Sequence, residues 1–241
     1  MLYIMRHGKT NWNELHKLQG RTDIPLNDEG REMAREAREK YKDINFDICY
    51  CSPLVRARET AEIFLEGRNI DIIPDDRLKE MSFGKYEGTA NCFRDLNSPV
   101  RVLFKDPANY KGVEGGESLE QLYARTGDFL ENVVKPQLAE GKDILIVGHG
   151  AMNSSILCQV KNIPVEKFWD AGIENCRLMQ LLWYFKINTR FDDVKKHYRR
   201  WYLFSLSIKE QFANIENGIE KNTKKYKKKF SWYIFGIFTG V

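Results

Sequence analysis

The sequence predicts an α/β fold, a three-layer α/β/α sandwich with a mainly parallel central sheet. Two observations lead to this prediction. Short apolar runs alternate with longer amphipathic segments through residues 1–185, and the apolar runs stop at turns that contain Gly, Pro or Arg. Strands that alternate with helices are typical of a layered domain whose parallel sheet is covered by helices. A chain of 241 residues accommodates one such domain with an appendage.

The first half of the chain predicts three strands and two helices in alternation. Short apolar runs are typical of buried parallel strands, and apolar residues at spacings of three and four are typical of helices. Asn27 or Asp28 is the expected cap of the first helix, because either side chain can accept a backbone N–H hydrogen bond there. The expected elements are a strand at 2–5, a helix at 31–43, a strand at 46–52, a helix at 54–67 and a short strand at 70–76.

The second half of the chain begins with an insertion at residues 81–115, which is rich in Gly, Asn and aromatic residues and is expected to be irregular. Ser118 and Gln121 then form a pattern typical of a capping box at the start of a long helix. The segment DILIVGHGA predicts the strongest strand of the chain. The expected elements are a helix at 118–141, a strand at 143–151, a helix at 152–162 and a last strand at 174–185.

Chemically reactive side chains follow four of the predicted strands: Arg6 with His7, Arg56, Glu80 and His149. Taken singly, each has a structural alternative, since a histidine near a glycine is often a surface residue and an arginine often forms a salt bridge. Ligands of such sheets bind beyond the carboxyl ends of the strands, where all four strand ends meet. Two histidines and two arginines at this edge together indicate a functional site.

The chemistry of these side chains fits a phosphoryl group. The guanidiniums of Arg6 and Arg56 can hold a dianionic phosphate through paired hydrogen bonds, and His149 can add a third donor. A neutral imidazole of His7 can attack phosphorus and form a phosphohistidine, while the surrounding cations stabilise the transition state. Glu80 is the expected acid that protonates the leaving alkoxide and the base that later activates water.

Four segments in this order resemble the histidine phosphatase superfamily, also called the phosphoglycerate mutase-like family: MRHGKTNWN, CSPLVRARETA, LKEMSFGKYEG and IVGHG. The resemblance covers roughly residues 1–180 and implies the phosphoglycerate mutase-like fold. It implies that His7 is the nucleophile and Glu80 the proton donor. The implied catalytic set is His7, Glu80, His149, Arg6 and Arg56.

The resemblance also implies a phosphate-binding set. Asn13 matches a position whose amide contacts phosphate in the family, and Thr10 and Gly20 lie on the same loop as weaker candidates. The whole implied set is Arg6, His7, Asn13, Thr10, Gly20, Arg56 and His149. The family needs no metal, so we expect a metal-independent enzyme without a cofactor.

The segment KEMSFGKYEG favours the phosphatase branch of the family, since the mutases carry an ERHYG-type segment there. The favoured function is therefore a histidine acid-type phosphatase, a phosphoric monoester hydrolase that acts on small phosphorylated substrates. One alternative is a cofactor-dependent phosphoglycerate mutase. A second is a non-enzymatic protein that binds phospholigands or contacts a membrane surface through its tail. Either a monomer or a dimer is compatible with the sequence.

Residues 186–241 lie outside the resemblance and form a basic, aromatic extension. Its segment 224–241, which runs from Lys224 to Val241, places a lysine run before aromatic and apolar residues, and weak contact with a membrane surface is one of three interpretations of this pattern. A helix packed on the domain and a tail of low order, including an abnormal C-terminus, are the alternatives. Residues 230–241 are too few for a transmembrane helix, which needs about 20 apolar residues. No recognition module accompanies the lysines, so no nucleic-acid partner is expected.

The five cysteines are odd in number and their spacing matches neither a disulfide framework nor a zinc site. Such cysteines are typical of a reducing compartment. No basic segment precedes the first apolar run, which is too short for a signal peptide. We therefore expect a cytoplasmic protein.

Overall fold

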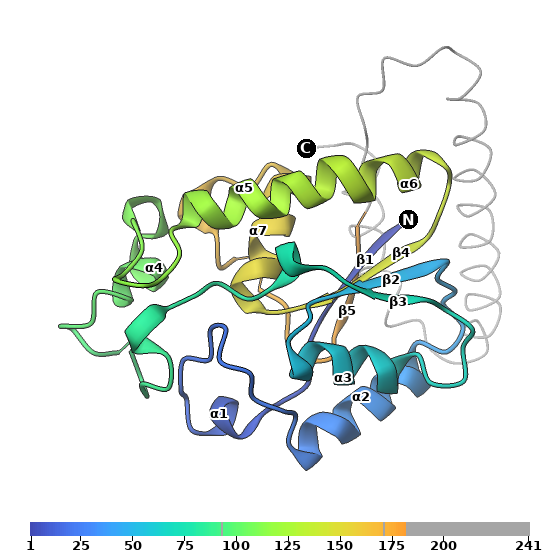
Figure 1. Ribbon diagram of the computed structural model, residues 1–241, viewed down its shortest axis with the longest axis horizontal. Coiled ribbons are helices and arrows are strands. Elements are labelled where there is room, and N and C mark those ends of the chain that lie inside the picture. Colours follow the sequence, from blue (N-terminus) through green and yellow to red (C-terminus); the bar gives the residue numbers. More distant parts are fainter. Residues whose placement is uncertain (93, 171, 182–241) are drawn as a thin grey trace, which may run out of the picture. The chain divides into compact units, whose positions relative to one another are not determined.

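The computed structural model describes residues 1–92, 94–170 and 172–181 (Figure 1). Within them lies one five-stranded sheet with the order β3-β2-β4-β1-β5. Its first four strands run parallel, and β5 pairs antiparallel with β1. The mainly parallel sheet is thus confirmed. The strands are β1 Leu2–Arg6, β2 Ile48–Cys51, β3 Ile72–Pro74, β4 Ile144–Gly148 and β5 Leu178–Leu181.

Helices cover both faces of this sheet, as Figure 1 shows: α2 and α3 lie together on one side, and α5, α6 and α7 lie on the other. This arrangement confirms the predicted three-layer sandwich. The short helix α1 follows β1, and a 3₁₀ turn at Asp76–Leu78 follows β3. The α-helices are α1 Asn11–Glu14, α2 Asp28–Lys40, α3 Val55–Phe64, α4 Arg101–Lys105, α5 Leu119–Phe129, α6 Lys135–Ala139 and α7 Gly150–Lys161.

The long helix expected at 118–141 is present but divided. Ser118 caps it, because its hydroxyl accepts the N–H of Gln121 at 3.2 Å while Gln121 Oε1 accepts the N–H of Ser118 at 2.9 Å. This confirms the capping box. A π-helical turn at Leu130–Val134 then separates α5 from α6. Pro136, the second residue of α6, has no N–H to donate, which explains why the regular hydrogen-bond pattern is interrupted just before it.

Two other expectations differ from the structure. The insertion at 81–115 contains short helical elements: the 3₁₀ turns Gly84–Tyr86 and Pro107–Asn109, and α4. The last strand begins later than the expected 174–185: β5 starts at Leu178, after Cys176 takes a positive φ of 55°, and residues 182–185 lie outside the described residues. The expected cap of α2 is confirmed, and of the two candidates it is Asn27, whose Oδ1 accepts the N–H of Gly30 at 2.8 Å.

The core is formed by apolar residues on both faces of the strands. β4 is completely buried, as expected for a central parallel strand. On the face covered by α2 and α3, the Phe46 ring packs edge-on against Tyr3 with centroids 5.1 Å apart and lies 5.9 Å from Phe64. No described helix is long and apolar enough to cross a membrane. The predicted boundary between 1–185 and 186–241 stays a prediction, because the extension lies outside the described residues.

Candidate active site

The two histidines are brought together by neighbouring strands. Arg6 of β1 is in register with Gly148 of β4, and the N–H of His7 donates to the Gly148 carbonyl at 2.9 Å. His7 and His149 each follow the last residue of their strand. Their rings lie with centroids 5.1 Å apart and planes inclined at 59°, and both side chains are buried. The parallel pairing of β1 and β4 therefore sets both imidazoles at one edge of the sheet.

The ring of His7 is oriented by its own backbone. Nδ1 lies 2.6 Å from the carbonyl oxygen of Gly8. Because a carbonyl oxygen only accepts hydrogen bonds, Nδ1 carries the proton and Nε2 holds the lone pair of the neutral ring. Burial holds the pKa of His7 well below its ordinary value, and the charges of Arg56 and Arg6 lower it further. This ring is suited to act as a nucleophile through Nε2.

Arg56 lies in the first turn of α3 and is completely buried. Its Nη2 donates to the carbonyl of Gly20 at 2.7 Å and its Nη1 to the carbonyl of Thr22 at 2.9 Å. Burial lowers the pKa of Arg56 to about 10, although nearby carboxylates, Glu80 first, oppose this effect. The guanidinium therefore remains charged at neutral pH and is held by two main-chain acceptors.

Several buried nitrogens at this edge have no hydrogen-bond partner among the described residues. They are Arg6 Nε, Arg56 Nε and both ring nitrogens of His149. Burying a polar group without a partner costs about 1–3 kcal/mol, so native structures seldom keep several together. Burial also lowers the pKa of His149, and the charges of Arg56, His7 and Arg6 add to this shift. An anion bound here would accept hydrogen bonds from the unpartnered N–H groups and would offset the mutual repulsion of the positive charges. The cluster therefore has the donor set of a phosphate site.

Glu80 lies beside this cluster at the start of α7. Its carboxylate accepts the N–H groups of Met81 at 2.8 Å, Met152 at 3.0 Å and Ala151 at 3.2 Å. Gly150 lies against the same groups, since a Cβ added there would be in ordinary van der Waals contact with Glu80 Oε2 at 3.6 Å and Arg6 Cζ at 3.9 Å. Glu80 is nearly buried. The carboxyl group is thus fixed next to the arginine and histidine donors, where a leaving group would need its proton.

The loop residues of the predicted phosphate set have contacts within the protein. Thr10 caps α1, and Asn13 Oδ1 accepts the N–H of Thr10 at 3.0 Å and its hydroxyl at 3.2 Å. The NH₂ group of Asn13 is the part of its amide that can donate to an anion. The carbonyl of Gly20 holds Arg56. Direct contact of Thr10, Asn13 and Gly20 with phosphate stays a prediction.

Two residues that hold the backbone around His7 could not be picked out as readily from the sequence. Thr60 Oγ1 accepts the N–H of Gly8 at 3.0 Å, and Asn175 Nδ2 donates to the carbonyl of His7 at 2.6 Å. Thr60 lies one helical turn after Arg56 in the segment CSPLVRARETA, and this spacing is a signal that points to it. Asn175 has no comparable signal, because it reaches His7 from a distant loop. A residue larger than glycine does not fit at Gly8, because an added Cβ would lie 2.4 Å from the carbonyl oxygen of Gly30.

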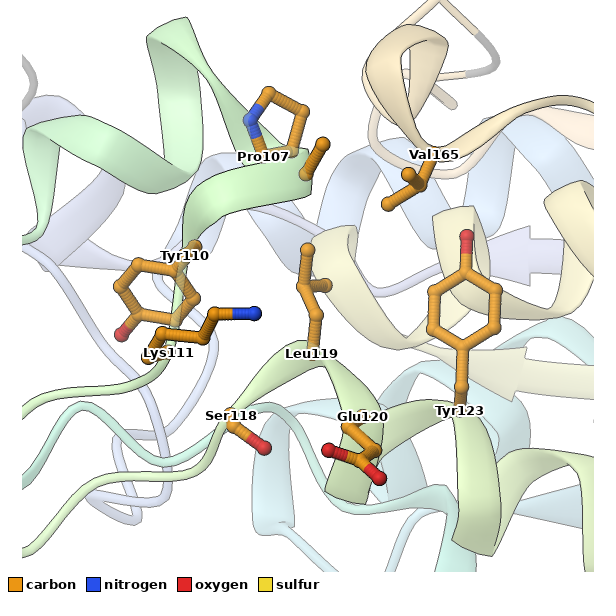
Figure 2. Close-up of a pocket in the computed structure, with 9 residues that line it drawn as sticks. Pro107, Tyr110, Lys111, Ser118, Leu119, Glu120, Tyr123 and Val165 are labelled. Carbon is orange, nitrogen blue, oxygen red and sulfur yellow. The ribbon is translucent and has the colours of Figure 1, made fainter.

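A separate pocket of about 400 Å³ lies where α5 begins (Figure 2). In Figure 2 the amino group of Lys111 points toward Leu119, and the hydroxyl of Tyr123 points toward Val165. No predicted site residue lines this pocket. Its lining consists of Pro107, Ala108, Tyr110, Lys111, Ser118, Leu119, Glu120, Tyr123 and Val165.

Comparisons with known proteins agree with this geometry. The family model of the histidine phosphatase superfamily (branch 1) matches residues 2–189. The uncharacterized phosphatase PhoE of Bacillus subtilis is 38% identical over 157 residues, which cover 65% of this chain and 75% of PhoE. The probable phosphoglycerate mutase GpmB of an Enterobacter species is 28% identical over 181 residues, covering 75% of this chain and 83% of GpmB.

A solved structure shares the fold as well. Bacillus stearothermophilus YhfR aligns with a TM-score of 0.67 at 29% identity, over 73% of this chain and 88% of YhfR. The family model spans every strand-end residue from Arg6 to His149. The resemblance drawn from the four sequence segments is confirmed: the chain belongs to the histidine phosphatase superfamily, branch 1.

Proposed function

We propose that this protein is a histidine acid-type phosphatase that hydrolyses small phosphomonoesters through a phosphohistidine on His7. One observation carries the proposal: a neutral, oriented imidazole stands beside four buried nitrogens of Arg6, Arg56 and His149 that have no partner among the described residues. The N–H groups of the two guanidiniums and the one N–H of a neutral His149 ring can bind a dianionic phosphoryl group, and the imidazole Nε2 of His7 can attack it.

In the first step, His7 Nε2 forms a bond to phosphorus while the bond between phosphorus and the ester oxygen breaks. The arginines and His149 stabilise the charge on the three other oxygens. Glu80 gives its proton to the departing alkoxide.

In the second step, water attacks the phosphohistidine. Glu80, now a carboxylate, accepts a proton from this water, and the bond between Nε2 and phosphorus breaks with its electron pair returning to the ring. Inorganic phosphate is the product, and the enzyme regains its starting protonation. One carboxyl group therefore serves both steps.

Phosphoglycerate mutase activity is the second candidate, since GpmB also aligns with this chain. The higher identity to the phosphatase PhoE, 38% against 28%, and the segment KEMSFGKYEG support hydrolysis instead. Incubation with 3-phosphoglycerate separates the two activities. Release of phosphate without 2-phosphoglycerate supports the phosphatase, and formation of 2-phosphoglycerate without net phosphate release contradicts it.

The covalent intermediate is tested by rapid acid-free quenching with a ³²P-labelled phosphomonoester. We expect a labelled protein whose label is lost in acid, as for a phosphoramidate, and no label in His7→Ala. His16→Asn is the matched control: His16 is exposed and has a positive φ of 50°, which asparagine tolerates. Unchanged turnover in His7→Ala would exclude His7 as the nucleophile.

Two further proposals concern the setting of the enzyme. We propose a cytoplasmic location, which is supported by five buried free cysteines. We also propose that the segment 224–241 contacts anionic membranes weakly, on the strength of its lysine run. Sedimentation with anionic vesicles, comparing the whole chain with residues 1–190, tests the second proposal. Equal sedimentation of the two would contradict it.

A further inference from the structure

We propose that Glu87 is a positioning residue that fixes the guanidinium of Arg56 through the peptide unit between Gly20 and Arg21. The inference rests on the proposed function, because its consequence is the binding of the phosphate by Arg56. Glu87 directly follows the 3₁₀ turn Gly84–Tyr86, on a loop far from α3 in the chain.

The carboxylate of Glu87 accepts four hydrogen bonds. Oε1 accepts the N–H groups of Arg21 and Phe83, each at 3.0 Å. Oε2 accepts the N–H of Thr22 at 2.8 Å and its hydroxyl at 2.5 Å. Hydrogen bonds to an ionised acceptor are roughly twice as strong as neutral ones. Glu87 therefore ties the segment 20–22 firmly to the loop that carries the carboxylate.

The same segment holds Arg56 from its other side. The peptide unit that donates the Arg21 N–H to Glu87 presents the Gly20 carbonyl to Arg56 Nη2 at 2.7 Å. A trans peptide is planar and rigid, so its C=O and N–H point in opposite directions and move together. The carbonyl of Thr22 likewise accepts from Arg56 Nη1 at 2.9 Å. Glu87 therefore holds both carbonyls that bind the guanidinium: that of Gly20 through the same peptide unit, and that of Thr22 through the N–H and hydroxyl of the same residue.

The backbone at Gly20 is shaped by this contact. Gly20 has a positive φ of 56°, and an added Cβ would lie only 2.1 Å from Glu87 Oε1. Only glycine satisfies both conditions without strain. The next part of the loop also holds α3, because Asp23 Oδ1 accepts the N–H of Val55 at 2.7 Å. The start of α3 and the arginine in its first turn are therefore positioned by one loop, and Glu87 is its charged anchor.

Phosphate recognition by a buried guanidinium depends on its exact placement. A displacement of about 1 Å in a positioning group can cost roughly a hundredfold in rate. Glu87→Gln replaces one acceptor oxygen by an NH₂ group, which then faces two donors and cannot accept from them. We expect the peptide units to rotate and Arg56 to lose its orientation, so that affinity for phosphate falls while the charge of Arg56 is kept.

The test uses the full chain, p-nitrophenyl phosphate as substrate and inorganic phosphate as a competitive inhibitor. Glu87→Gln and Gly20→Ala should each raise the inhibition constant for phosphate about 10- to 100-fold. Glu59→Gln is the matched control, because its carboxylate also joins a backbone N–H, of Leu26 at 3.3 Å, to a guanidinium, of Arg31 at 2.6 Å. The control should stay within about twofold of wild type, with melting temperatures recorded for all variants.

Coupling to Arg56 distinguishes positioning from general loss of structure. In an Arg56→Lys background, Glu87→Gln should weaken phosphate binding far less than it does in wild type, since the group it orients is gone. Equal losses in both backgrounds, or a loss no larger than that of Glu59→Gln, would overturn the inference. Failure of the proposed function looks different: the wild-type chain would then neither hydrolyse the substrate nor bind phosphate.

Discussion

The imidazole rings of His7 and His149 lie 5.1 Å apart between centroids, on the ends of two strands that are paired in parallel. The two rings differ in their hydrogen-bond partners although they lie close together. His7 Nδ1 is bound to the Gly8 carbonyl, whereas both ring nitrogens of His149 are buried without a partner among the described residues. The bound ring has one defined tautomer and suits a nucleophile, and the second ring suits a donor to the phosphoryl group.

The first prediction concerns this donor. His149→Ala should lower kcat about 10²- to 10³-fold, because it removes a hydrogen bond that stabilises charge in the transition state. The labelled phosphoenzyme should still form, only more slowly, and rapid quenching measures this rate. The circular dichroism spectrum and melting temperature check that the buried substitution is tolerated. A kcat within about twofold of wild type would remove His149 from the site.

The second prediction concerns the acid. Glu80→Gln should lower kcat about 10²- to 10⁴-fold for a primary alkyl phosphate, whose alkoxide needs a proton to leave. It should slow p-nitrophenyl phosphate less, since that leaving group is stable without protonation. Steady-state kinetics with both substrates measures the difference, and Glu59→Gln serves as the control carboxylate. Equal slowing of the two substrates would assign the acid role to another group.

The third prediction concerns the pH dependence of activity. Burial and the charges of Arg56 and Arg6 hold the pKa of His7 well below its ordinary value of 6.5. The nucleophile therefore stays neutral and active as the pH falls through 6.5, and protonation inactivates it only at lower pH. After correction for protonation of the substrate, the acid limb of kcat/KM should lie below pH 6.5. An acid limb of the enzyme at or above that pH would contradict the structure.

The fourth prediction concerns stability and pH. Burial lowers the pKa of both His7 and His149 in the folded chain, so the unfolded chain binds more protons below pH 6.5. The contribution of the two neutral histidines to the free energy of unfolding is therefore complete above pH 6.5. It is lost as the pH falls from 6.5 toward the lowered pKa values of the folded chain. Each histidine contributes a slope of about 1.4 kcal/mol per pH unit. Urea unfolding at pH 7.5 and 5.5 measures the change, and His149→Gln should reduce it.

The fifth prediction concerns the unpartnered donors. Inorganic phosphate should raise the melting temperature, because it binds the folded chain and supplies acceptors to Arg6, Arg56 and His149. A concentration of 100 times Kd adds about 2.7 kcal/mol to the free energy of unfolding. Sulfate-free chloride at equal ionic strength is the control and should have a much smaller effect. An equal response to phosphate in wild type and Arg56→Lys would show that the anion binds elsewhere.

Much of the candidate site follows from local sequence. Arg6, His7 and His149 come directly after apolar strands, and parallel strands end at a common edge, so their meeting could be predicted without coordinates. Arg56 and Glu80 follow from the same rule, because short connections after β2 and β3 lead to them. The capping box of Ser118 and Gln121 is also local, since both partners lie within one helical turn.

Other features were decided only in the folded chain. Three contacts join segments that are distant in sequence. They are the antiparallel pairing of β5 with β1, the hydrogen bond from Asn175 to His7, and the hydrogen bond from the Arg21 N–H to Glu87. Periodicity and spacing report only on neighbouring residues. The sequence by itself therefore determined the layered fold and the identity of the reactive groups. The tertiary structure decided their protonation and orientation, because burial and long-range hydrogen bonds set the tautomer of His7 and the position of Arg56.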